Sequence, residues 1–266
     1  MATTDLPANK APLWEFGLGV GAFAFANYRG ADTGEVYPLP VPYFVYRGRF
    51  LRADREGLRG RLFRSERAEI NISLNATTPV RSSATSARRG MPNLRPTFEI
   101  GPSLDLHLWR AVDGRARLDL RLPLRTAVTV SAPPEAIGLF FAPRLNLDLV
   151  DIAGHAGWNL GMLAGPLFAD RRYHGYFYEV APGYADPSRP AYSAHGGYSG
   201  TQMLASLSVR KPGYWIGAYA RFDALSGAAF IDSPLVRSNG YWAVGVAVAW
   251  MIARSSAIVD PGGDAP

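Results

Sequence analysis

Long stretches of this chain alternate strictly between apolar and polar residues, and this period of two constrains its fold more than any other feature. Successive side chains of a β-strand point to opposite faces, so the pattern predicts strands with two unlike faces. The clearest run, from Ala116 to Val130, alternates charged residues with Leu118, Leu120, Leu122 and Leu124. The same alternation recurs in residues 68–76, 97–110 and 138–150. The sequence therefore predicts an all-β fold.

The composition supports this prediction and excludes several chemistries. The chain has 28 Gly and 21 Pro, too many for a helical bundle, because both residues break helices. It has no Cys, which rules out disulfides, thiolate metal sites, iron–sulfur clusters and a cysteine nucleophile. The net charge is +6, but the basic residues are spread along the chain instead of gathering with aromatics, which argues against nucleic-acid binding.

The length of the alternating runs favours a membrane barrel over a soluble sandwich. Soluble strands usually have about five or six residues, whereas these have about ten or more and suffice to cross a bilayer when tilted. Short turns alternate with long loops, and neither of the best apolar stretches, 152–169 and 238–253, reads as a transmembrane helix. In membrane barrels, Trp and Tyr gather in a girdle at the strand ends, where the bilayer meets water. We expect such a girdle to contain Trp14, Tyr37, Trp109, Tyr173, Tyr176, Tyr178, Tyr214, Trp215, Tyr241, Trp242 and Trp250.

We predict a single-chain antiparallel transmembrane β-barrel of about 12 strands, within an even range of about 10 to 14. Thirteen segments qualify, so one is wrong, and the short arginine-rich region 49–64 is the weakest. The candidates are 14–25, 37–46, 49–55, 58–64, 67–77, 97–110, 115–130, 138–150, 156–168, 173–182, 198–210, 214–223 and 240–253. We expect a periplasmic extension over 1–13, the barrel over 14–254 and a tail over 255–266. The first residues contain no apolar signal segment, so we expect an export signal to have been removed.

Several stretches resemble the MltA-interacting protein family, also called MipA/OmpV. They include WEFGLGVGAF, YPLPVPYFVYRG, RGMPNLRPTFEIGPSL and the loop SGAAFIDSPLV, whose Gly227, Asp232, Ser233 and Pro234 match the family pattern. The resemblance implies an outer-membrane barrel of a Gram-negative bacterium. It also implies a scaffold that joins a lytic transglycosylase to a murein synthase, a role ascribed to one family member. It supplies no catalytic residues. An aromatic at or near the C-terminus is usual for such barrels, but here a tail follows Trp250.

The polar faces of the predicted strands supply the main candidate site. We expect them to line the lumen, either as a charged constriction that selects solutes or as Arg–carboxylate pairs that fill the interior, and we favour the pairs. The residues are Glu69, Asn71, Asp105, His107, Arg117, Asp119, Arg121, Arg125, Arg144, Asn146 and Asp148.

Other candidates carry weaker signals. The four histidines lie far apart without a metal-ligand or catalytic spacing, so we expect no metal, no cofactor and no enzyme activity. Asp223 and Asp232 lack the spacing of a calcium loop. Loop arginines match the phosphates of lipopolysaccharide, which leaves lipopolysaccharide contact open against an ordinary solvated loop. They are Arg81, Arg88, Arg89, Arg95, Arg171 and Arg172.

The sequence thus leads to a non-enzymatic scaffold in the outer membrane, linked to murein remodelling. Its expected partners are membrane lipid, a lytic transglycosylase and a murein synthase, with lipopolysaccharide left open. The alternative is a small passive pore whose lumen is lined by arginine and prefers anions.

Overall fold

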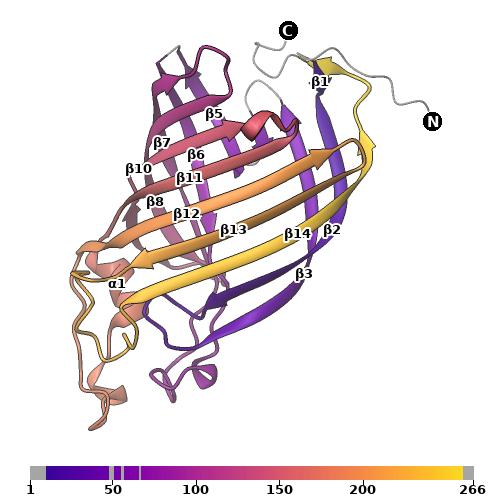
Figure 1. The fold of residues 1–266 in the computed structure, drawn as a ribbon. Helices are drawn as coiled ribbons and strands as arrows, with labels where there is room; N and C mark the ends of the chain where they lie inside the picture. The colour runs from indigo at the N-terminus through magenta and orange to yellow at the C-terminus, as the bar shows by residue number, and fades with distance from the viewer. Residues whose placement is uncertain (1–9, 48–50, 55–56, 66, 260–266) are drawn as a thin grey trace.

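The structure, a computed structural model, describes residues 10–47, 51–54, 57–65 and 67–259. Thirteen of its strands form one antiparallel sheet that curves into a barrel (Figure 1). They are β2 (Trp14–Ala26), β3 (Gly34–Arg47), β4 (Leu51–Asp54), β5 (Gly57–Arg64), β6 (Ala68–Ala76), β7 (Thr97–Arg110), β8 (Ala116–Thr129), β9 (Ala136–Phe141), β10 (Arg144–Val150), β11 (Trp158–Ala169), β12 (Gly197–Lys211), β13 (Tyr214–Ala224) and β14 (Gly240–Arg254). The alternating segments therefore fold together as one all-β unit.

The barrel closes because β14 pairs with β2. Strands β9 and β10 both lie between β8 and β11, so they are two halves of one wall strand interrupted at Ala142 and Pro143. Counting them once, the described part of the chain forms a barrel of twelve strands, since thirteen less one is twelve. The predicted transmembrane-type barrel of about 12 strands is confirmed.

One predicted strand is wrong, and it is not the one the sequence made weakest. Residues 49–64 contribute β4 and β5 to the wall. The segment 173–182 instead begins as the helix α1 (Arg171–Tyr178). Asp170 caps this helix, because its side chain accepts a hydrogen bond from the Tyr173 backbone N–H. The closely spaced aromatic residues of this segment are typical of a strand, whereas the helix-capping residue Asp170, three residues before Tyr173, favours a helix.

The two ends of the barrel differ. At one end the strands join through short connections, such as 111–115 and 212–213, and the first and last described residues lie there (Figure 1). A two-residue pair, β1 (Ala11–Pro12) with β15 (Ile258–Val259), ties the two terminal extensions together. At the opposite end the connections are long, and they carry α1 and the short helices η1 (Ser82–Ala84) and η3 (Pro182–Tyr184), whereas η2 (Ile152–Gly154) lies at the short-turn end.

The outer surface of the barrel is apolar. Leu18, Val20, Leu124 and Val246 are about half exposed, while the residues between them on the same strands are more buried. An exposed apolar surface this extensive suits contact with lipid instead of water. No helix among the described residues is long and apolar enough to cross a membrane.

The predicted aromatic girdle is partly right. Trp109, Tyr214, Trp242 and Trp250 are exposed on the outer surface near strand ends. The prediction is wrong for Tyr173, Tyr176 and Tyr178, which belong to α1 at the long-loop end. It is also wrong for Tyr37 and Trp215, whose rings pack on Phe25 and Tyr43 of the inner face. Position at a strand end does not reveal which face a ring occupies.

Candidate functional site

Charged side chains of neighbouring strands meet inside the barrel. On β7 and β8, Asp105 and Arg121 are opposite each other in the register, both are about 5% exposed, and Arg121 Nε lies 3.6 Å from Asp105 Oδ2. Asp105 also accepts hydrogen bonds from Asn71 Nδ2 at 3.0 Å and Ser103 Oγ at 2.6 Å. Because a buried charge is costly unless it is paired, these contacts stabilise the interior wall.

A second carboxylate, Asp119, has three basic side chains around it. Arg117 Nε lies 2.9 Å from it, Arg121 Nη2 3.7 Å and His107 Nδ1 2.9 Å. Arg117 also reaches Asp148 on β10, with Nη2 at 3.2 Å from Oδ2. Together with the Asn71–Asp105 contact, these pairs link four strands, β6, β7, β8 and β10, in one ionic network.

The remaining predicted lumen residues lie on the same face. Glu69 is half-buried and is opposite Asp105 in the register, and Asn146 is opposite Asp119. Arg144 is half-buried, and no carboxylate of the described residues lies within ion-pair distance of it. Arg144 is therefore a positive charge without an ion pair among the described residues, and it lies near Arg121 and Arg125.

Glu99, on the same inner face, connects the barrel wall to the loops, although it was not among the predicted lumen residues. Its carboxylate pairs with Arg125, with Nε at 3.0 Å, and accepts hydrogen bonds from Asn75 Nδ2 at 3.1 Å and Tyr173 Oη at 2.9 Å. Glu99 is fully buried. Its place in the alternation of β7 could have revealed it, since Glu99 shares a face with Asp105.

Above the ionic network, loop residues form a cap with an apolar core. The cap consists of residues 27–33, 77–96, 170–196 and 225–239, and its centre is Phe230, which stacks on Tyr178 with ring centroids 3.7 Å apart. The α1 helix crosses the mouth of the barrel, because Tyr173 contacts Glu99 on β7 while His174 contacts Ser199 on β12. The mouth at the long-loop end is therefore occupied by packed side chains.

The four residues of the predicted family motif lie in this cap. Ser233 is buried, and its hydroxyl donates to the Tyr178 carbonyl oxygen at 2.8 Å. Gly227 has φ +78°, a left-handed conformation that favours glycine. Asp232 and Pro234 flank Ser233, and the Leu235 carbonyl that follows accepts a hydrogen bond from Tyr28 Oη at 2.7 Å. Burial raises the pKa of the Tyr28 hydroxyl to about 12, so it stays a donor.

A polar network sits where α1 meets β12. His174 Nε2 is 3.0 Å from Ser199 Oγ, and its Nδ1 is 2.6 Å from the His195 carbonyl oxygen. Arg29 donates to Ser199 Oγ at 2.9 Å and to Asp223 at 2.8 Å. The Asp223 carboxylate is thus paired with the Arg29 guanidinium, and Arg221 donates to it as well.

His174 and Ser199 have the separation of a base and a nucleophile, but both are fully buried. Burial lowers the pKa of the His174 imidazole. A neutral imidazole that donates from Nδ1 to the His195 carbonyl and accepts at Nε2 from Ser199 satisfies every polar atom of this contact. Among the described residues, no group of three His, Asp or Glu side chains gathers as a metal site.

The loop arginines have different surroundings. Arg88 is buried and donates to the Phe177 and Pro92 carbonyl oxygens, so it holds the cap together. Arg95 is exposed, 3.9 Å from Glu135. Arg171 and Arg172 are exposed on α1 and line a cavity of about 670 Å³ with Arg88. Arg81 and Arg89, within the 77–96 segment of the cap, are also exposed.

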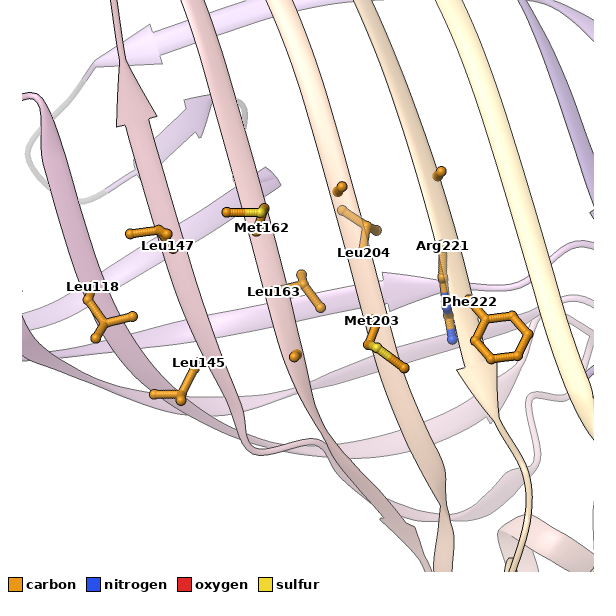
Figure 2. Close-up of a pocket in the computed structure, with 12 residues that line it drawn as sticks. Leu118, Leu145, Leu147, Met162, Leu163, Met203, Leu204, Arg221 and Phe222 are labelled. Atoms are coloured by element: carbon orange, nitrogen blue, oxygen red, sulfur yellow. The ribbon is translucent and has the colours of Figure 1, made fainter. Parts of the chain in front are cut away.

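The outer wall carries a shallow apolar depression of about 500 Å³ (Figure 2). It crosses β8 and β10 to β13, where the small residues Ala164, Ala205 and Ala220 leave room between larger side chains. Leu145, Met162, Met203 and Phe222 belong to its lining and are exposed. Its lining is mainly aliphatic, so it suits contact with lipid chains.

The sequence model of one protein family, described as MltA-interacting protein MipA, matches residues 18–252. No curated protein matches the chain. Among solved structures, the chain is similar to outer membrane phospholipase A from Escherichia coli at 13% identity, covering 93% of this chain and 94% of that chain with a TM-score of 0.31. The toluene transporter TbuX of Ralstonia pickettii is 10% identical, with 93% and 71% covered and a TM-score of 0.24. A porin is 9% identical, with 90% and 100% covered and a TM-score of 0.27. Likeness at this level transfers no activity and no site.

Proposed function

This chain is an outer-membrane β-barrel protein of the MltA-interacting protein family, and from that premise we propose that it is a scaffold for murein remodelling in a Gram-negative envelope. The family description names MltA as a partner, a lytic transglycosylase, and a murein synthase is the second partner in this proposal. The short-turn end faces the periplasm, where murein lies, since outer-membrane barrels place short turns there.

One observation carries the proposal: the cap occupies the outer mouth of the barrel. Tyr173 and His174 of α1 link β7 to β12, four strands apart around the barrel, and Phe230 stacks on Tyr178 of the same helix. A barrel closed by packed side chains is poorly suited to passing solutes, whereas its surfaces stay available for binding. The ionic network of the lumen supports the same function, because it makes the barrel a rigid platform.

The periplasmic end offers a built surface for a partner. The paired extensions β1 and β15 lie there, and Arg47 holds them to the wall by donating to the Pro12 carbonyl oxygen at 2.7 Å. Beside them, Glu15 pairs with Arg210 at 2.7 Å and with Arg47 at 3.3 Å. A protein partner would meet an ordered surface that loses little freedom on binding.

Site-specific crosslinking tests the scaffold. Since the chain has no cysteine, a single Val112→Cys change at the fully exposed residue of the 111–115 turn gives one reactive thiol on the periplasmic side. With a photoactivatable maleimide on that thiol in outer membranes, we expect a crosslink to a lytic transglycosylase or a murein synthase. The matched control is Ser83→Cys, which is exposed in the cap and should give none. Absence of both enzymes from the Val112→Cys crosslinks contradicts the scaffold.

A passive pore is the second candidate, favoured by the positive charge of Arg144, which has no ion-pair partner among the described residues. An arginine without a carboxylate partner among the described residues would draw small anions into the lumen. Planar bilayers loaded with the protein would then show anion-selective channels, and Arg144→Gln would reduce the selectivity. Silent bilayers at high protein load contradict the pore and leave the scaffold standing.

The proposal assigns no catalysis to the chain and treats His174 and Ser199 as supports of the cap. The unchanged protein should then hydrolyse neither lipid nor peptide ester substrates, and Ser199→Ala should make no difference. Any hydrolysis that this substitution abolishes contradicts the assignment. The exposed Arg171 and Arg172 are the residues that would contact lipopolysaccharide phosphates, and the barrel wall contacts membrane lipid.

A further inference from the structure

The barrel wall is interrupted between β3 and β6 in the half near the long loops. Strand β3 pairs with β2 along its whole length but with β4 only at Tyr46 and Arg47. On the other side, β6 pairs with β5 only from Glu69 to Ile72. Strand β4 has four residues, and only two residues separate it from β5 in the sequence, so this hairpin is short. On that edge, no described strand pairs with the residues of β3 that precede Tyr46.

The sequence of β3 keeps this edge unpaired. Backbone bonds from Asn27 N to Thr33 O and from Arg47 N to Leu13 O show that odd-numbered residues of β3 bond to β2. The even-numbered residues therefore turn their backbone groups toward the opening. Three of them are Pro38, Pro40 and Pro42, which have no N–H to donate. A neighbouring strand cannot pair fully with this edge, so the interruption is a property of the sequence.

On the β3 side of the opening the inner face is apolar, whereas on the β6 side Asn71, Ser73 and Asn75 carry polar groups that bond inside the lumen. Leu39 points to the interior, opposite Gly21 in the register, and is 46% exposed. Val41 is half-buried on the same face, and Tyr37 stacks on Phe25 with centroids 4.9 Å apart. Water against an exposed leucine is unfavourable, whereas a hydrocarbon chain would cover it.

We propose that the opening between β3 and β6 is a lateral port through which an acyl chain of an outer-leaflet lipid enters the lumen and packs on Tyr37, Leu39 and Val41. The port lies in the half of the wall near the long loops, which sets the leaflet. An extended peptide is the other natural occupant of an open strand edge, but the prolines deny it three backbone hydrogen bonds. A hydrocarbon chain needs no such bonds.

Fluorescence quenching by brominated lipid tests the port in the full chain. Bimane attached to Leu39→Cys is compared with bimane on Ser206→Cys, which lies half-buried on the inner face of β12 away from the opening. In vesicles of phosphatidylcholine brominated along the acyl chain, we expect at least about twofold quenching at position 39, relative to unbrominated vesicles, and none at 206. Val20→Cys, on the outer face of β2, is the positive control.

A second site and a second quencher keep the result decisive. Val41→Cys should repeat the quenching, which covers a failure of Leu39→Cys to fold, and gel mobility before and after heating confirms that each variant is a closed barrel. Aqueous iodide should quench position 206 more than positions 39 and 41. If iodide quenches all three inner positions and brominated lipid quenches none, the opening holds water and the port is wrong.

Discussion

The cap and the lumen wall are both buried, yet they are stabilised by opposite means. In the cap, Phe230 and Leu235 are fully buried among apolar side chains, as in the core of a soluble domain. In the wall, Asp119 and Arg121 are nearly as buried but are held by ion pairs. Because the leucines of the strands face lipid, mainly polar residues of the strands face the lumen. An apolar core forms only where loop residues pack together in the cap.

Glu99 is the point where the two regions meet, and removing it should have the largest effect. Glu99→Ala leaves Arg125 without its ion pair and Tyr173 without its acceptor. Loss of one partner of a buried pair costs about 3–5 kcal/mol. We expect a fall of about 4 kcal/mol in the free energy of unfolding in lipid vesicles, measured by urea titration. Glu35→Ala, at an exposed residue, should change it little. Equal effects would mean that Glu99 does not couple cap and wall.

Phe230→Ala probes the cap alone. Truncating a fully buried phenylalanine costs about 3 kcal/mol or more, because a cavity remains against Tyr178. We expect the loops to become sensitive to protease while the barrel keeps its heat-modifiable mobility on gels. Phe222→Ala, on the outer face, is the matched control and should leave the loops resistant. If Phe230→Ala unfolds the barrel as well, cap and wall are one unit and the comparison fails.

Ser233→Ala tests the motif loop. It removes two buried hydrogen bonds, one from Oγ to the Tyr178 carbonyl oxygen and one from the Leu235 backbone N–H to Oγ, and we expect a loss of about 2 kcal/mol in the free energy of unfolding of the cap. Hydrogen exchange of the α1 amides would report it. Ser226→Ala, an exposed change in the same loop, should leave exchange as it was. Unchanged exchange in both variants would show that Ser233 does not support the helix.

Lowering the pH should have the smallest effect of these changes on the stability of the cap. Burial lowers the pKa of His174 below its ordinary 6.5, so the unfolded chain binds the proton more readily than the folded one. The stability this residue gives is present above about pH 6.5 and is lost as the pH falls below it. His174→Gln should remove that part of the pH dependence of cap exchange. A pH profile that His174→Gln leaves unchanged contradicts the assignment.

The strands could be predicted from the sequence, since alternation is a local property. Residues 97–110 form β7 with the predicted bounds, and 115–130 differs from β8 by one residue at each end. The cap could not be predicted, because Tyr28, Tyr178 and Phe230 come from three segments that are distant in the sequence and show no periodicity. The helix α1 was missed for the same reason, although Asp170 offered a capping signal.

The charged face of each strand was predictable, but its partners were not. Register decides that Arg121 lies opposite Asp105 on one side and Arg144 on the other, and the sequence does not contain the register. The prolines of β3 were visible from the start. Their meaning required the parity of the backbone hydrogen bonds, which places all three nitrogens on one edge.

A cysteine scan along β8, with a nitroxide label at each position from Leu118 to Arg125 in the folded barrel in vesicles, tests the two faces of the wall most directly. Labels at the leucine positions should be accessible to oxygen dissolved in the lipid and inaccessible to a water-soluble nickel reagent. Labels at the positions between them should be less accessible to oxygen, so that oxygen accessibility alternates with a period of two. Leucine positions that favour the nickel reagent, or the same accessibility at both sets of positions, would contradict a barrel with lipid outside and ion pairs inside.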